Sequence, residues 1–162
     1  MKRGLVVSCI GLLCSMMLGC AESHEGLIRE TIQMIDQGGV DVANITKEVK
    51  AATEYATEKQ LNKLDLKLAE KATEKLKLTG DKTQEIKSRI AKLGSSISED
   101  DRKQYAKNNA ESLNTSFKKL IANMKELRDA LDAAERIDPV AVSAFRKKLV
   151  EAEGPFEAQA RQ

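Results

Sequence analysis

The residues of this 162-residue chain that could do chemistry are few, and most of them lie near the N-terminus. Cysteine occurs three times, as Cys9, Cys14 and Cys20, and Cys20 directly follows a short apolar run that ends in Gly19. His24 is the only histidine. A catalytic nucleophile needs a neighbouring base, and the pattern places none beside any serine. A lone histidine without a partner is typical of a polar residue beside a helix start.

The segment before Cys20 has the three-part layout of a secretory leader. Lys2 and Arg3 form a positive start, and the run from residue 5 to residue 18 carries no charge. Met16-Met17-Leu18-Gly19-Cys20 resembles the lipobox of bacterial lipoproteins, although methionine stands where leucine is commonest in its second position. The resemblance implies cleavage by signal peptidase II between Gly19 and Cys20. It also implies a diacylglycerol on the Cys20 sulfur, and often a further acyl chain on the new amine.

Two other interpretations of this leader remain open. A transmembrane anchor needs roughly 20 apolar residues, whereas this run has about 15. A plain signal peptide cut elsewhere would leave Cys20 without a role. With lipidation, two or three acyl chains anchor a protein far more firmly than one. Ala21 is not the aspartate associated with inner-membrane retention, so the resemblance favours the outer membrane if the cell has one.

The chain that remains after removal of residues 1–19 has 143 residues, the size of one domain. Lys2 and Arg3 leave with the leader, so 27 basic residues become 25 against 25 acidic ones. Formal neutrality argues against a nucleic-acid partner held by bulk charge. Cys20 is then the only cysteine, which excludes an intramolecular disulfide, a cysteine zinc site and thiol catalysis.

The remaining sequence is rich in Ala, Lys, Glu and Leu and has apolar residues at alternating spacings of four and three, which predicts long helices. We expect an all-α fold with helices over residues 23–53, 58–93, 98–137 and 139–153. The apolar register continues through Gly38-Gly39 and through Gly80, which predicts unbroken helices there. A kink or break at 38–41, or a bend near Gly80, is the alternative.

Local signals predict where these helices begin and end. Thr57 with Gln60 fits the capping-box pattern, and Ser98 followed by three acids is a strong helix start. Gly94 and the pair Gly154-Pro155 are expected helix ends, with residues 156–162 frayed.

Three long helices joined by short turns must run antiparallel, each burying one stripe. The sequence therefore predicts an up-down-up three-helix coiled-coil bundle with a short fourth helix, in a single domain over residues 20–162. The stripes are rich in Ala, Thr and Leu, so the core is thin. Dimerisation through a second stripe would add buried surface, and a homo-oligomer stays open.

The other candidate sites have simple structural interpretations. Glu99, Asp100 and Asp101 suit the positive end of a helix dipole better than a cation site, and nothing matches a calcium loop. Gly38-Gly39 lacks the Lys-Ser or Lys-Thr of a phosphate loop. A group of lysines interspersed with acids favours a mixed-charge surface, with contact to anionic lipid headgroups as the alternative; these are Lys63, Lys67, Lys71, Lys75 and Lys77.

Beyond the lipobox, Cys20 followed by Ser23-His24-Glu25 and Leu27-Ile28 resembles uncharacterised small helical lipoproteins of planctomycete type, over about 50 residues. That resemblance carries no catalytic, metal or cofactor-binding residue. We expect a lipid-anchored, non-enzymatic helical domain of the cell envelope, facing the periplasm or the exterior, that acts by contact with a protein or another envelope component. A holder of a hydrophobic ligand or client is the alternative.

Overall fold

A computed structural model describes residues 23–160 of the chain. It contains four α-helices and no strand within this range: α1 (His24–Glu58), α2 (Lys67–Gly94), α3 (Glu99–Glu135) and α4 (Pro139–Ala160). The predicted all-α class is confirmed. The predictions for Gly19 and Cys20 lie outside the described residues.

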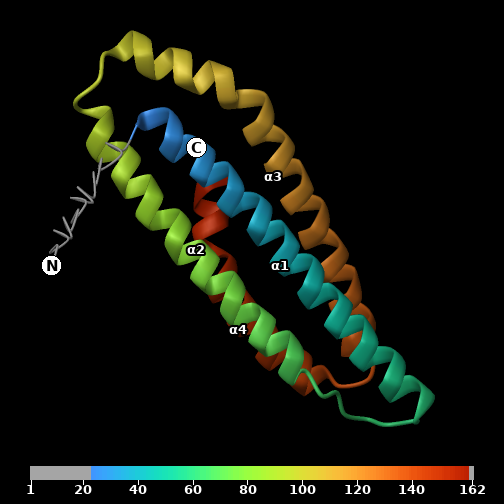
Figure 1. Ribbon diagram of the computed structural model, residues 1–162. Helices are drawn as coiled ribbons and strands as arrows, with labels where there is room; N and C mark the ends of the chain where they lie inside the picture. Colours follow the sequence, from blue (N-terminus) through green and yellow to red (C-terminus); the bar gives the residue numbers. More distant parts are fainter. Residues whose placement is uncertain (1–22, 161–162) are drawn as a thin grey trace, which may run out of the picture.

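The helices form an elongated bundle in which α1 packs against α2 on one side and α3 on the other (Figure 1). Helix α4 packs against α2 and α3. With 35 residues, α1 is roughly 52 Å long at 1.5 Å per residue. The molecule is therefore a rod along which α1 runs for roughly 52 Å.

The rod has two halves of different composition, because α4 is shorter than the other helices. We define the four-helix half as α4 with residues 38–80 and 117–135, and the three-helix half as residues 24–37, 81–94 and 99–116. Of the 20 buried apolar residues in the described range, only Leu27, Ile35 and Ile86 belong to the three-helix half. The main core therefore lies where α4 is present.

Helix α1 ends later than expected, and the predicted capping box at Thr57 and Gln60 is wrong. The Thr57 hydroxyl lies inside α1 and donates to the Thr53 carbonyl at 2.8 Å. Gln60 has a positive φ of 52°, and the amides of Gln60 and Leu61 donate back to Thr57 and Ala56 at 3.2 and 2.8 Å. These bonds form the Schellman ending that glycine usually makes. Here glutamine adopts the left-handed conformation instead.

Helix α2 consequently begins at Lys67, not at residue 58. The connecting residues 59–66 are held by two contacts. The Leu66 side chain is buried in the core, and the Leu64 amide donates to the Asp138 carboxylate at 3.2 Å. The connection is therefore fixed by the start of α4, a contact 74 positions away in the sequence.

Gly38 and Gly39 lie within an unbroken α1, as the apolar register predicted. They face different helices. A Cβ on Gly38 would lie 2.8 Å from the Phe156 ring of α4, too close for an unshifted neighbour. Gly39 faces α3, where the Asn123 side-chain amide donates to the Gly39 carbonyl at 2.8 Å. The missing side chain of Gly38 leaves room for the Phe156 ring of α4 against α1.

Helix α4 does not end at Gly154-Pro155, and the predicted fraying from residue 156 is wrong up to residue 160. Gly154 has no Cβ to meet the following proline ring, which removes the clash that usually excludes helix before proline. Phe156 is 1% exposed, and a Cβ on Gly80 would lie 3.0 Å from the Pro155 ring. The Gln84 side chain also donates to the Pro155 carbonyl at 3.2 Å. Packing on α1 and α2 therefore keeps this segment helical.

The first turns of α3 are more exposed than the apolar register predicts. Ala106 and Ala110 stand at positions of the four-and-three apolar spacing of residues 98–137, but both are exposed. Fully buried positions in α3 begin at Ser116. Helix α4 does not extend this far, so it does not cover the first turns of α3, and in Figure 1 these turns curve away from α1.

Candidate functional site

The first described residue, Ser23, lies three positions after Cys20 and caps α1. Its hydroxyl oxygen accepts the Gly26 amide at 3.0 Å, which satisfies one of the free donors at the helix start. Glu25 follows in the first turn and forms an ion pair with Arg29. Helix α1 therefore begins four residues after the expected lipid-bearing cysteine.

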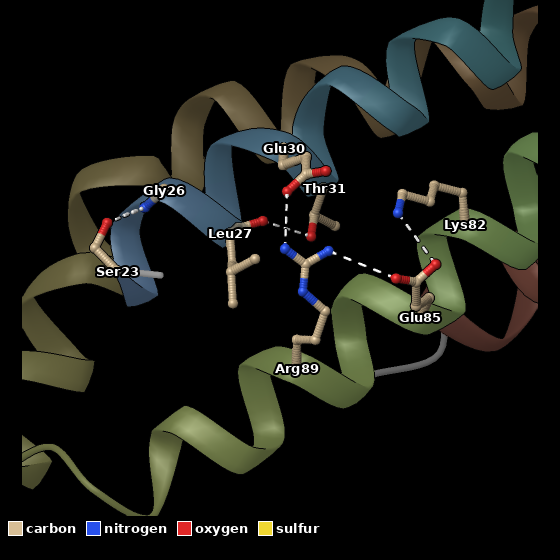
Figure 2. Close-up of polar contacts among 8 residues, drawn as sticks. All are labelled: Ser23, Gly26, Leu27, Glu30, Thr31, Lys82, Glu85 and Arg89. Carbon is tan, nitrogen blue, oxygen red and sulfur yellow. Dashed lines mark hydrogen bonds and ion pairs between the residues drawn. The ribbon is translucent and has the colours of Figure 1, made fainter. Parts of the chain in front are cut away.

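Polar contacts join α1 to α2 near this start (Figure 2). The Arg89 guanidinium of α2 lies 3.8 Å from the Glu30 carboxylate of α1 and 3.7 Å from Glu85. Lys82 also pairs with Glu85, at 3.1 Å. Partly exposed pairs of this kind contribute little stability each, and Arg89 chiefly aligns the two helices.

His24 is half-buried and stacks on Tyr105 of α3, with ring centroids 5.6 Å apart and planes inclined by 28°. This contact ties the start of α1 to the first turns of α3. The arrangement is that of an aromatic packing pair.

The acids at the start of α3 are placed as a helix start requires. The Ser98 hydroxyl oxygen accepts the Asp101 amide at 3.1 Å, and Glu99, Asp100 and Asp101 occupy the first turn. Within residues 23–160, no group of three or more His, Cys, Asp or Glu side chains is arranged to hold a metal ion.

Asp41 is a buried carboxylate that the sequence analysis did not single out. It is 5% exposed, on α1 against α2. Its two oxygens accept hydrogen bonds from the Gln37 amide at 3.0 Å and the Thr79 hydroxyl at 2.9 Å. Buried charge is costly unless hydrogen-bonded. The Gln37 bond lies within α1, whereas the Thr79 bond links α1 to α2. In the sequence, the only indication that this carboxylate is buried is its place directly before the apolar position Val42.

Asp138 lies at the end of the rod opposite Ser23, and its carboxylate accepts two hydrogen bonds from different segments. One oxygen caps α4 by accepting the Ala141 amide at 2.9 Å, and the other accepts the Leu64 amide. These hydrogen bonds, led by that from Ala141, lower the pKa of the Asp138 carboxyl below its ordinary value, and the charge of Lys63 adds to the effect. The sequence indicated a boundary at Asp138-Pro139 but not this second partner.

The lysines singled out in the sequence lie on and beside the first half of α2. Lys67, Lys71 and Lys75 are exposed and make no ion pair with any described residue. Leu68 and Leu78, 59% and 68% exposed, share their face. We call Leu68, Lys71, Lys75 and Leu78 the α2 strip, since their spacing of three, four and three places them on one side of the helix.

A groove of about 470 Å³ adjoins the α2 strip where α1 turns into α2. Tyr55 and Leu61, both about half exposed, lie on it together with Lys63, Lys67 and Leu68. Glu48 and Asp65 are its acidic residues. Two lysines and two acids balance the charge of this corner groove. It continues the apolar side chains of the α2 strip, and Lys71 and Lys75 of the strip supply the net positive charge of the combined surface.

A second groove, of about 310 Å³, lies between α3 and α4. Its wall is mainly apolar, and Arg128 and Glu153 are its charged members. The apolar residues are Phe117, Leu120, Ile121, Met124, Leu149 and Phe156.

No protein-family model matches the chain, and neither the curated proteins nor the solved structures contain a match to it. In the described part of the chain, none of the helices combines the length and the apolar character needed to cross a bilayer.

Proposed function

We propose that this protein is a lipid-anchored, non-enzymatic helical domain of the bacterial cell envelope that acts by contact with a protein or another envelope component. Acyl chains on Cys20 would hold one end of the rod at a membrane, favouring the outer membrane if the cell has one. The helices would form an up-down-up coiled coil, with α4 packed on it as the short fourth helix.

The single observation that carries this proposal is the position of the rod relative to Cys20. Helix α1 begins at His24, is capped by Ser23 and continues without a break for 35 residues. The four-residue step from Cys20 to His24 spans at most about 14 Å. A lipid on Cys20 would therefore hold the start of α1 within about that distance of the membrane. The rest of a roughly 52 Å helix is then available for contacts.

Expression of the full chain in a bacterial host, beside Cys20→Ser, tests the anchor. We expect a mature chain that starts at residue 20, carries acyl groups by mass spectrometry and partitions into detergent, with processing blocked by globomycin. Cys20→Ser should lose the acyl groups and the partitioning. A mature wild-type chain without acyl groups overturns the proposal. Capture from solubilised membranes with wild type and Cys20→Ser in parallel then identifies the contact partner.

The α3–α4 groove favours a second candidate, a holder of a hydrophobic ligand or client. Its apolar wall and its volume of about 310 Å³ suit part of an acyl chain or a few apolar side chains. A holder should bind a hydrophobic dye while its far-ultraviolet circular dichroism remains that of the folded state, and Met124→Arg should abolish this binding. Cooperative melting without dye binding in the folded state favours the contact function instead.

A further inference from the structure

We propose that the corner groove and the α2 strip form a surface that binds a bilayer containing anionic lipid, so that the rod lies along the membrane and does not stand on its anchor. This inference rests on the proposed lipid anchor for its biological setting. The binding surface itself consists of residues in the described part of the chain.

Charge is distributed unevenly between the two neighbouring helices. Helix α2 has eight basic and four acidic residues, a net charge of +4, whereas α1 has three basic and seven acidic, a net charge of −4. Two acids of α2 form ion pairs away from the α2 strip. Glu70 pairs with Lys148 of α4 at 2.9 Å, and Glu85 pairs with Lys82 of α2 itself. Glu74 lines a groove with α4 residues. Lys71 and Lys75 of the α2 strip are exposed and pair with no acid in the described part of the chain, so they complement an anionic surface.

Exposed apolar side chains on the same surface favour a lipid bilayer over a partner that offers only negative charge. Leu68 and Leu78 flank Lys71 and Lys75, and Tyr55 and Leu61 continue the surface at the corner groove. Tyrosine suits the membrane interface because its ring is apolar and its hydroxyl polar. Lysine can extend its ammonium group to the headgroups while its methylenes lie on apolar surface. Leucine gains by leaving water for the acyl boundary.

The position of this surface determines the orientation of the rod. The hydrogen bond from Thr79 to Asp41 places the last residue of the α2 strip beside Asp41. Asp41 is 17 residues, or roughly 26 Å, along α1 from His24. The Debye length at physiological salt is about 8 Å, so an upright rod would hold its lysines beyond the attraction of the anchoring membrane. Binding through the α2 strip requires the rod to lie down.

The test uses the mature chain from residue 20 with Cys20→Ser, so that no acyl chain contributes. Sedimentation with vesicles of 30% phosphatidylglycerol in phosphatidylcholine should show binding that is absent with pure phosphatidylcholine. Since each lysine near an anionic surface contributes about a fivefold gain in affinity, Lys71→Gln with Lys75→Gln should reduce binding about 25-fold at low salt. Lys118→Gln with Lys119→Gln, exposed lysines of α3, is the control with equal charge change and should bind as wild type.

The apolar part is tested by Leu68→Gln with Leu78→Gln, which should lower vesicle binding about tenfold. The matched control is Val140→Gln with Val150→Gln, two exposed apolar residues of α4, which should leave binding unchanged. All four residues are exposed, so thermal melting should differ little among these variants.

The orientation of the rod on a vesicle can be measured by tryptophan fluorescence, because the chain contains no tryptophan of its own. Leu78→Trp provides a single fluorophore that should shift to the blue on vesicles and be quenched by brominated lipids, whereas Val150→Trp should do neither. Equal behaviour of the two variants contradicts a rod lying on α2.

Two outcomes overturn this inference. If the chain does not bind anionic vesicles while wild type is acylated in cells, the membrane surface is wrong and the anchor stands. If it binds soluble polyglutamate as tightly as vesicles, and Leu68→Gln with Leu78→Gln has no effect, the surface fits an acidic protein instead. If the wild-type chain is not acylated in cells but the chain still binds anionic vesicles, the lipid anchor is wrong and the membrane-binding surface stands.

Discussion

The two halves of the rod are built by different means, although α1 runs through both. In the four-helix half, Phe145 and Phe156 of α4 fill the space between the other helices and are each 1% exposed. In the three-helix half, the contacts include the His24–Tyr105 stack and the Arg89 ion pairs. Burial of apolar surface supplies most of the stability of a small domain, so the four-helix half should be the more stable.

This difference between the two halves predicts where substitutions should lower the stability of the protein least. Well-packed apolar groups are sensitive to the loss or addition of a single methyl group, whereas half-exposed polar contacts contribute little each. The end of the rod near Cys20 should therefore open locally at lower free energy than the end near the 59–66 connection.

The largest effect should come from Phe156→Ala in the four-helix half. Truncation of a fully buried phenylalanine typically costs about 3–5 kcal/mol, and here it also removes the ring that packs against Gly38. Urea denaturation followed by circular dichroism measures the change in free energy of unfolding. Val150→Ala, at an exposed position of the same helix, should cost less than about 0.5 kcal/mol. Similar costs for the two variants would show that α4 is not part of the core.

A single methyl group should separate the two adjacent glycines of α1. Gly38→Ala places a Cβ against the buried Phe156 ring and should destabilise by about 1–3 kcal/mol. Gly39→Ala meets Asn123 at 3.6 Å, an ordinary contact, and should be neutral or stabilise by up to about 1 kcal/mol through helix propensity. Urea denaturation of both variants checks the difference. If Gly38→Ala and Gly39→Ala raised the free energy of unfolding equally, the Phe156 ring of α4 would not be packed against Gly38.

A smaller effect is expected from Tyr105→Ala in the three-helix half. An aromatic pair adds about 0.5–1.5 kcal/mol beyond its buried area, and only the His24 contact is lost on the α1 side. Hydrogen exchange should accelerate in the first turns of α1 and α3 and stay unchanged around Phe145. Faster exchange throughout the rod would show that the two halves unfold as one unit.

The smallest effect should appear only in acid, at Asp138. Because its pKa is lowered in the folded protein, its charge stabilises the fold above the ordinary aspartate pKa of about 3.9. That stabilisation is lost as the pH falls through the lowered value. Asp138→Asn should therefore be less stable than wild type at pH 6, with the difference shrinking toward pH 2.

Thermal melts from pH 2 to pH 6 measure this difference. Asp129→Asn serves as the control, since Asp129 is exposed and has no hydrogen bond or ion pair with any described residue. Its melting temperatures should follow wild type at every pH. A difference for Asp138→Asn that grows toward pH 2 would mean that the lowered pKa is wrong.

Much of the fold follows from the sequence because helix formation depends on local spacing and capping. The register through Gly38-Gly39 and Gly80 predicted unbroken helices, and Ser98 with its acids predicted the start of α3. The functional expectation at Cys20 also comes from the sequence alone and stays a prediction. A lipobox is a linear signal, and Cys20 lies outside the described residues.

Only the tertiary structure decided where α4 ends and how α1 meets α2. Gly154-Pro155 reads as a helix end because local propensity disfavours proline in a helix, but Phe156 is held between Gly38 and Gly80, which are far away in the sequence. Thr57 with Gln60 reads as a helix start, yet α1 continues through Thr57, and the 59–66 connection is fixed by Leu66 in the core and by Asp138. Local signals set which segments are helical, whereas the burial of a few side chains from distant segments sets where those helices stop.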